Sequence, residues 1–285
     1  MPSRVWSSTA IFILVSVTVA ALLSLVFSQF ITLTAARTIQ TSLPAVPPGA
    51  AEGMASAGLL YSPPKPEEAP ASVREAVLLG ARIMADPQKH AGKYVGNALK
   101  CSNCHFNGGI SQGGKNGGLS LVGVAATYPK YRSRQHAAVD LVTRINDCFE
   151  RSMNGRPLPP DSSEMTAILT YYQWIAKGLP IYGDFPWLGL KGVPGGSPKD
   201  RVKGGTIFAS TCAPCHGTTG HGTAMAPALW GKESYNDGAG MAKAETLAAF
   251  ALLNMPRGNP TLSTGEAVDV AAYVDSQPRP HFAKK

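Results

Sequence analysis

Apolar residues recur at the spacing of an amphipathic helix in several separate segments of this chain, and strand-like alternation of apolar and polar positions is essentially absent. This pattern predicts an all-α fold. One helix is predicted to open with the capping-box pattern SVRE at residues 72–75 and to run to about Met84. Another is predicted from about Gln135 to Met153, ahead of a stretch that contains Gly and Pro.

DSSE at residues 161–164 is expected to cap the last helix of this first set, which bears two Tyr and one Trp. The same succession of elements then repeats to the end of the chain. Further helices are predicted over about residues 199–210 and 244–253, and STGE at residues 263–266 has the pattern of a cap for the last helix.

The repetition predicts two tandem domains, at residues 72–180 and 199–285. The connector at residues 181–198 is rich in Gly and Pro but also contains Phe185 and Trp187, so we expect it to pack against the domains.

The N-terminal part of the chain has a different composition. Residues 10–27 form an apolar run whose only polar members are Ser and Thr, with Arg4 before it and Arg37 after it. Residues 1–36 therefore form a membrane anchor or a signal segment, and the length of the run favours an anchor that is not cleaved. Residues 37–71 are rich in Ala, Pro and Ser, which predicts a flexible tether. Either fate of the segment places the two domains on the periplasmic side of the membrane.

Four of the five cysteines lie in two C-x-x-C-H motifs, the attachment sequence of c-type haem. The first is Cys101, Cys104 and His105, and the second is Cys212, Cys215 and His216. Disulfides would leave both His without a role, and zinc would need further ligands at suitable spacing. We therefore expect two covalently bound haem c groups, each in a class I cytochrome c-like domain, with His105 and His216 as proximal iron ligands.

Charge and composition limit the classes of molecule that this protein is expected to bind. The formal net charge is +8, yet Lys and Arg are scattered and no basic run is interleaved with aromatic residues. Nothing specific therefore indicates a nucleic-acid partner. The basic excess fits a small anionic substrate or an acidic redox protein better.

The distal ligands decide what each haem can do. In the second domain the candidates are Met225, Met241 and Met255, and Met255 is favoured because it follows an apolar helix and precedes Pro256. A thioether ligand raises the haem potential, which suits an electron-exit site.

In the first domain the candidates are Cys148, Met153 and Met165. Spacing alone leaves open whether Cys148 binds iron or is an inert buried thiol. A thiolate ligand would stabilise Fe(III) and lower the potential of that haem.

Basic residues surround Cys148 in the sequence. If residues 135–153 are helical, Arg144, Arg151 and Ser152 share a face with Cys148. Guanidinium groups bind oxyanions through charge-assisted hydrogen bonds, so the segment predicts an anion site, although some of these Arg are also expected to pair with haem propionates. The remaining polar residues nearby are Lys130, Arg132, Arg134 and Asn154, of which Lys130 and Arg132 are as readily plain surface charges.

From about Ser72 to its end, the chain resembles the thiosulfate dehydrogenase family of dihaem cytochromes. The resemblance rests on CSNCH followed by NGG (residues 101–109), on RINDCFERSMNG (residues 144–155) and on NMP (residues 254–256). It implies ligation of haem 1 by His105 and Cys148 and of haem 2 by His216 and Met255. It also implies that Arg134, Arg144 and Ser152 line the substrate pocket, and our own interpretation adds Arg151 and Asn154 to it.

The same resemblance implies the reaction. Two thiosulfate ions are joined into tetrathionate, and two electrons pass from haem 1 to haem 2 and on to an external acceptor, such as a small cytochrome c or a high-potential iron–sulfur protein. Some members favour the reverse direction. Some also carry Lys directly before the Met and exchange ligands with redox state; Asn254 stands there in this chain, so we expect stable His/Met ligation.

Two other functions stay open on the sequence. A membrane-anchored dihaem electron carrier without a substrate of its own would use Met153 rather than Cys148 at haem 1. A Sox-type sulfur-oxidation cytochrome would also use a Cys-ligated haem, but a full second domain with an axial Met argues against it.

Overall fold

The computed structural model describes residues 61–190, 193 and 199–283, so the expected anchor (residues 1–36) and most of the expected tether lie outside the described residues. Within the described part, no helix is long and apolar enough to cross a membrane. The helices and strands are α3 (Ala71–Ala85), α4 (Pro87–His90), β1 (Lys130–Arg132), β2 (Ala137–Val139), α5 (Leu141–Asp147), α6 (Ser163–Trp174), α7 (Arg201–Ile207), α8 (Ala213–His216), α9 (Ala244–Asn254) and α10 (Thr264–Asp275).

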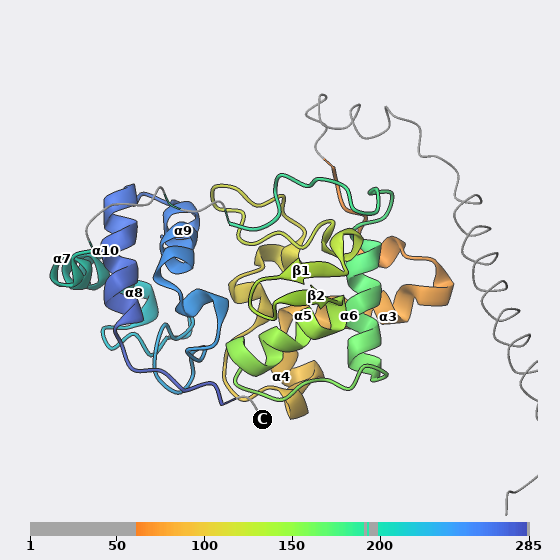
Figure 1. The fold of residues 1–285 in the computed structure, drawn as a ribbon, viewed down its shortest axis with the longest axis horizontal. Helices are drawn as coiled ribbons and strands as arrows, with labels where there is room; N and C mark the ends of the chain where they lie inside the picture. The colour runs from red at the N-terminus through yellow and green to blue at the C-terminus, as the bar shows by residue number, and fades with distance from the viewer. Residues whose placement is uncertain (1–60, 191–192, 194–198, 284–285) are drawn as a thin grey trace, which may run out of the picture. The chain divides into compact units, whose positions relative to one another are not determined.

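The first domain is built on the contact between its first and last helices, α3 and α6 (Figure 1). Gly80 is buried at this contact, where a Cβ atom on it would lie 2.3 Å from the carbonyl oxygen of Ala167 and 2.6 Å from the Cβ of Tyr171. Only a residue without a side chain allows the two backbones to approach so closely. Apolar side chains of both helices, with Phe149 and Leu158, form the first core.

The second domain repeats this contact with α7 and α10. A Cβ atom on the buried Gly204 would lie 2.1 Å from the carbonyl oxygen of Asp269 and 2.9 Å from the Cβ of Tyr273. The predicted capping box is present, since Ser263 Oγ accepts from Glu266 N and the Glu266 carboxylate accepts from Ser263 N. The predicted repeat of helical domains is therefore visible in the structure, down to a glycine that faces an aromatic residue in each copy.

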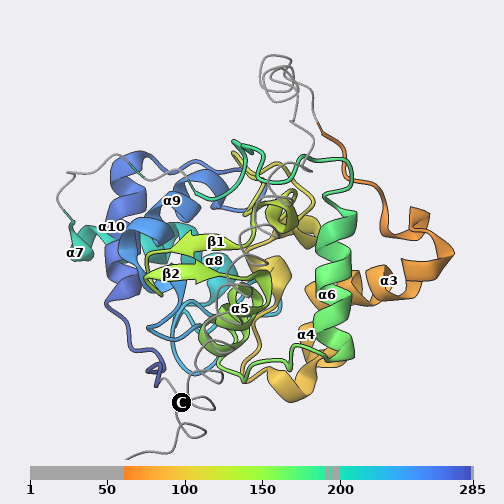
Figure 2. The ribbon, with the colours of Figure 1, turned by 45° about the vertical axis from the view of Figure 1, so that its right-hand side comes forward.

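The helix predicted from Gln135 to Met153 is wrong in its first half. Strands β1 and β2 form an antiparallel hairpin in which Tyr131 pairs with Ala138 (Figure 2). Helix α5 begins only after Asp140, whose side chain accepts a hydrogen bond from Thr143 N at 2.7 Å. This cap satisfies a backbone donor at a helix start that the periodicity did not reveal. The helix then widens into a π-helical turn at Cys148–Ser152.

The cap predicted for the first helix is also wrong, although its span is close. The residue before α3 is Pro70, which makes no side-chain cap, and the hydroxyl of Ser72 does not serve as one. Residues 61–70, expected to belong to the tether, contact the first domain: Trp174 Nε1 donates to Lys65 O at 2.9 Å, and Tyr61 Oη donates to Lys177 O at 2.9 Å. These bonds order backbone that composition alone marks as extended.

The connector packs as expected. Phe185 is buried, and Trp187 Nε1 donates a hydrogen bond to Val122 O at 2.9 Å.

One segment of the second half of the chain completes the first domain. We call residues 234–242 the cross-domain strap, because Tyr235 and Ala239 are buried in the first core. Amide side chains tie the strap to the first domain in both directions: Asn97 Nδ2 donates to Ser234 O of the strap at 3.0 Å, and Asn236 Nδ2 of the strap donates to Glu150 O at 2.9 Å. Two buried residues from the second half of the chain therefore complete the first core.

Replacing Gly80 with Ala should destabilise the protein by about 1–3 kcal/mol, because the new methyl group would overlap the α6 backbone, which cannot move independently. Guanidinium denaturation of the holoprotein, followed by circular dichroism, measures the change.

Gly265→Ala is the matched control. Nothing lies within 4 Å of the position of its Cβ, so this substitution should be neutral or stabilise by up to about 1 kcal/mol. Equal guanidinium denaturation midpoints for the two variants would contradict a close contact between the backbones of α3 and α6.

Candidate active site

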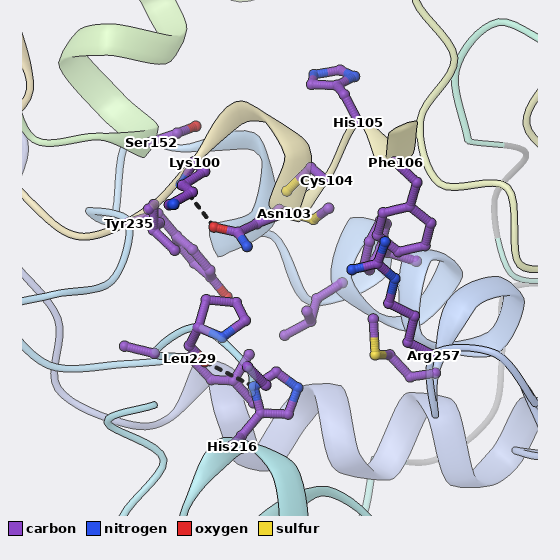
Figure 3. Close-up of a pocket in the computed structure, with 18 of the residues that line it drawn as sticks. Lys100, Asn103, Cys104, His105, Phe106, Ser152, His216, Leu229, Tyr235 and Arg257 are labelled. Carbon is purple, nitrogen blue, oxygen red and sulfur yellow. Dashed lines mark hydrogen bonds between the residues drawn. The ribbon is translucent and has the colours of Figure 1, made fainter. Parts of the chain in front are cut away.

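A cavity of about 300 Å³ runs through the described part of the chain and joins the two C-x-x-C-H motifs (Figure 3). Most of its lining is apolar, as is usual for a site that takes a large ligand. The residues with ligand chemistry on its walls are Cys101, Cys104, His105, Cys148, Met153, Cys212, Cys215, His216, Met225, Met241 and Met255.

Each motif histidine is fixed by one hydrogen bond. His105 Nδ1 lies 2.8 Å from Leu119 O, and His216 Nδ1 lies 2.8 Å from Pro227 O. A carbonyl oxygen only accepts, so Nδ1 carries the proton and Nε2 keeps its lone pair. Burial lowers the pKa of His105 to about 4 and also lowers that of His216, so both rings are neutral at physiological pH. Both have the tautomer of an iron ligand.

The thiols are free, as covalent haem attachment requires. All five cysteines fall in the described part of the chain, and none is in a disulfide. Burial raises the pKa of Cys101 and Cys104 to about 12 and that of Cys212 to about 11. Among the described residues, no three His, Cys, Asp or Glu side chains cluster as they would around a metal ion. The apolar cavity and the two oriented His match a porphyrin instead.

All three candidate methionines of the second domain line the cavity, but their surroundings differ. Met225 is 74% exposed, and Met241 packs against the first core. Met255, directly after α9, is the one that is half-buried within the second domain.

Cys148 meets Arg144 at the first motif. Arg144 Nη1 lies 3.0 Å from Cys148 Sγ, one helical turn apart as the spacing predicted. The negative charge that the sulfur can carry raises the pKa of Arg144. Met153 lines the same cavity, whereas Met165 is fully buried in the first core away from it.

The hairpin contributes a further arginine. Arg134 lies in the turn between β1 and β2, and its guanidinium donates to Gly238 O of the cross-domain strap. Desolvation and the positive charges of Arg151, Arg144 and Arg132 lower the pKa of Arg134. Arg134 therefore lies partly out of solvent and close to other guanidinium groups, an arrangement that favours an anion.

Arg151 and Asn154 are not among the residues that line the cavity, and neither are Arg134 and Arg144. Arg151 lies near Arg134, because both guanidinium groups donate to Gly238 O. Arg151 Nε pairs with Asp147 Oδ1 at 2.8 Å, and its guanidinium lies 4.0 Å above the Phe282 ring. Asn154 Nδ2 donates to Ser234 O at 2.7 Å. Both residues attach other parts of the chain, while Ser152 does line the cavity.

Asn254, which stands before Met255, is fully buried and its amide is fully used. Its Oδ1 accepts from Gly118 N at 2.7 Å, and its Nδ2 donates to Phe250 O at 3.0 Å. An amide held on both sides keeps Asn254 fixed directly before Met255.

Sequence reasoning missed the parts of the site that come from distant segments. The acceptors Leu119 O and Pro227 O are backbone atoms, which no side-chain motif reveals. Tyr235 lines the cavity from the cross-domain strap, and only its place between two predicted helices distinguishes it in the sequence.

Two protein-family descriptions match the chain. The SoxA/TsdA cytochrome c domain matches residues 95–181, and the cbb3-type cytochrome c oxidase subunit III matches residues 200–274. The two matches coincide with the two haem-motif domains.

Curated relatives resemble most of the chain. A thiosulfate dehydrogenase of Stutzerimonas stutzeri is 39% identical over 230 residues, covering 77% of this chain and 73% of the relative. One of Allochromatium vinosum is 36% identical over 215 residues, covering 73% and 80%.

Among solved structures, thiosulfate dehydrogenase (TsdBA) of Marichromatium purpuratum in its "as isolated" form superimposes with a TM-score of 0.70 at 32% identity. The match covers 77% of this chain and half (50%) of that longer one.

The pairing of Arg151 with Asp147 gives a test of its structural role. Arg151→Ala should lower the free energy of unfolding by about 1.5–3 kcal/mol, since it leaves a poorly exposed carboxylate without its charged donor. Chemical denaturation of the holoprotein measures the loss.

Lys199→Ala is the control, because Lys199 and Glu245 form an ion pair that is largely in solvent. Its cost should stay below about 1 kcal/mol. Indistinguishable losses from the two variants would contradict a structural role for Arg151.

Proposed function

Because this chain belongs to the thiosulfate dehydrogenase family, we propose that it is an oxidoreductase that joins two thiosulfate ions into tetrathionate and passes two electrons to an external acceptor. The observation that carries the proposal is the 3.0 Å contact between Arg144 Nη1 and the Sγ of Cys148, which lines the same cavity as His105. It puts a sulfur nucleophile and an anion-binding group at the same point.

The two haem c groups would be held by the two motifs, with Cys101 and Cys104 or Cys212 and Cys215 as the attachment thiols. His105 and Cys148 would be the axial ligands of haem 1, and His216 and Met255 those of haem 2. When bound, the haems supply one-electron acceptors, of low potential at the thiolate site and of high potential at the thioether site.

Arginines bind and orient the substrate. Thiosulfate carries two negative charges, and Arg144 and Arg134 offer guanidinium donors that match its oxygen atoms. Ser152, on the cavity wall, offers a hydroxyl donor to the same oxygens. Because Arg144 also lies against Cys148 Sγ, an anion bound by its guanidinium group would lie next to that sulfur.

Cys148 then takes part in sulfur chemistry. Its thiolate would form a bond to the outer sulfur of one thiosulfate, and the two electrons released would pass to the external acceptor, so that a Cys–S–S–sulfonate results. A second thiosulfate attacks the sulfur next to Cys148, the bond to Cys148 breaks, and tetrathionate leaves. The thiolate is regenerated, no proton is consumed, and the two steps run backwards when electrons are supplied.

Electrons leave from the second domain in this proposal. The cavity reaches the surface at Cys215 and Met225, both of which are exposed. A small cytochrome c or a high-potential iron–sulfur protein could accept electrons here, because electron transfer requires only that the acceptor come close to the exposed residues Cys215 and Met225.

We further propose that the chain acts on the periplasmic side of a membrane, anchored by residues 1–36. The support is the uncharged apolar run at residues 10–27, whose length falls in the range of roughly 17–25 residues for a spanning helix. The covalent haem motifs agree with an exported protein.

The function is tested with the purified, oxidised holoprotein. Adding thiosulfate should produce the absorption bands of reduced haem and an equivalent amount of tetrathionate, and adding tetrathionate to the reduced protein should reoxidise it. Sulfate, an equally charged anion without an outer sulfur, is the control and should do neither. A carrier without its own substrate would respond to none of the three, and a Sox-type enzyme would form no tetrathionate.

The role of Cys148 is tested by Cys148→Met. A thioether in place of a thiolate should raise the potential of haem 1 by about 0.1–0.3 V, within the roughly 0.8 V over which axial ligands act, and turnover should be lost because no thiolate remains. Spectroelectrochemical titration and the thiosulfate assay give the two readouts.

Met153→Leu is the matched control at the rival position, since it keeps volume but removes the sulfur. It should leave both the potentials and the turnover unchanged. Full activity in Cys148→Met, or loss of a haem ligand in Met153→Leu, contradicts the assignment.

A further inference from the structure

Tyr235 presents a buried hydroxyl group for which the described residues provide no partner. The side chain is 7% exposed, and its Oη is buried without a hydrogen bond. It lines the cavity between the two motifs, and Figure 3 shows its hydroxyl pointing into the pocket. An unsatisfied hydroxyl in such a place is costly, so a group in the cavity must accept from it.

The ring is held so that the hydroxyl cannot turn away. Tyr235 sits in the cross-domain strap, whose Ser234 O accepts hydrogen bonds from Asn97 and Asn154. On its other side the guanidinium carbon of Arg279 lies 4.6 Å from the ring centre. Arg279 is itself fixed by a 2.8 Å bond from Nη2 to Val274 O.

The surroundings of the Tyr235 hydroxyl indicate what kind of group accepts its hydrogen bond. The lining of the cavity is mostly apolar, and a cationic group stands next to the phenol, so the site is suited to an anion. A haem carries two carboxylates on its propionate arms, and they are the anionic acceptors that a haem brings into this space. We propose that the Tyr235 hydroxyl donates a hydrogen bond to a propionate carboxylate of a haem bound in this cavity, with Arg279 adding positive charge behind it.

The inference rests on haem occupancy of the cavity but not on thiosulfate as the substrate. The proposed hydrogen bond would change the reduction potential of the haem that accepts it. A donor that withdraws charge from a propionate makes the ferric state less favourable, so it raises the potential of that haem. The residue acts on iron through the propionate, and it is a positioning and tuning residue rather than a catalytic one.

The test is Tyr235→Phe in the full-length holoprotein, titrated between dithionite and ferricyanide without thiosulfate. The equilibrium constant for one-electron reduction of one haem should fall about tenfold, which is about 59 mV. Resonance Raman spectra should show a shift of the propionate bending band of the same protein. A lowered potential at haem 1 or at haem 2 supports the proposal in either case and identifies which propionate accepts.

Tyr171→Phe is the matched control. Tyr171 is equally buried, but its Oη donates to Gly108 O at 2.9 Å and it does not line the cavity. It should lose folding stability without any change in the potentials or in the propionate band. If Tyr235→Phe also leaves both readouts unchanged, its partner is a water molecule and the proposal is overturned. A failed thiosulfate assay with a shifted potential would instead refute only the proposed function.

Discussion

The hydrogen bond from Gly118 N to Asn254 Oδ1 ties together the segments on which both haem sites depend. Gly118 directly precedes Leu119, whose carbonyl orients His105, and Asn254 directly precedes Met255. A fully buried amide whose donor and acceptor are both used has few alternative positions, because any movement would leave a polar group unsatisfied. The position of Met255 in the second domain is therefore set partly by the loop that orients His105 in the first.

The sulfur site is likewise positioned by one short segment of the chain. Arg144 and Cys148 are one turn apart on a short helix that begins at an Asp140 cap and ends in a π-helical turn. Ser152 lines the cavity, whereas Arg151 pairs with Asp147 one helical turn before it, so two neighbouring residues make different contacts.

The sequence revealed the features that depend on local chemistry. The two haem motifs, the caps at Ser162 and Ser263 and the Arg144–Cys148 spacing follow from short patterns, and each is visible in the structure. The hairpin at residues 130–139 escaped because its strands are three residues long and mostly exposed, so no alternation marks them. The contribution of the cross-domain strap to the first core escaped because Asn97 and Ser234, which share a hydrogen bond, are 137 positions apart, and nothing in a single sequence pairs such residues.

The cross-domain strap also has a consequence for how the molecule is made. A chain is synthesised from its N-terminus, so the residues of the first domain exist long before residues 234–242 do. Until those residues arrive, the places of Tyr235 and Ala239 in the first core are empty, and the cavity beside Cys101 and Cys104 lacks one of its lining side chains. The first domain in sequence is thus completed only by the second half of the chain. A gene fragment that ended after the connector would encode a cytochrome domain that lacks residues of its own core.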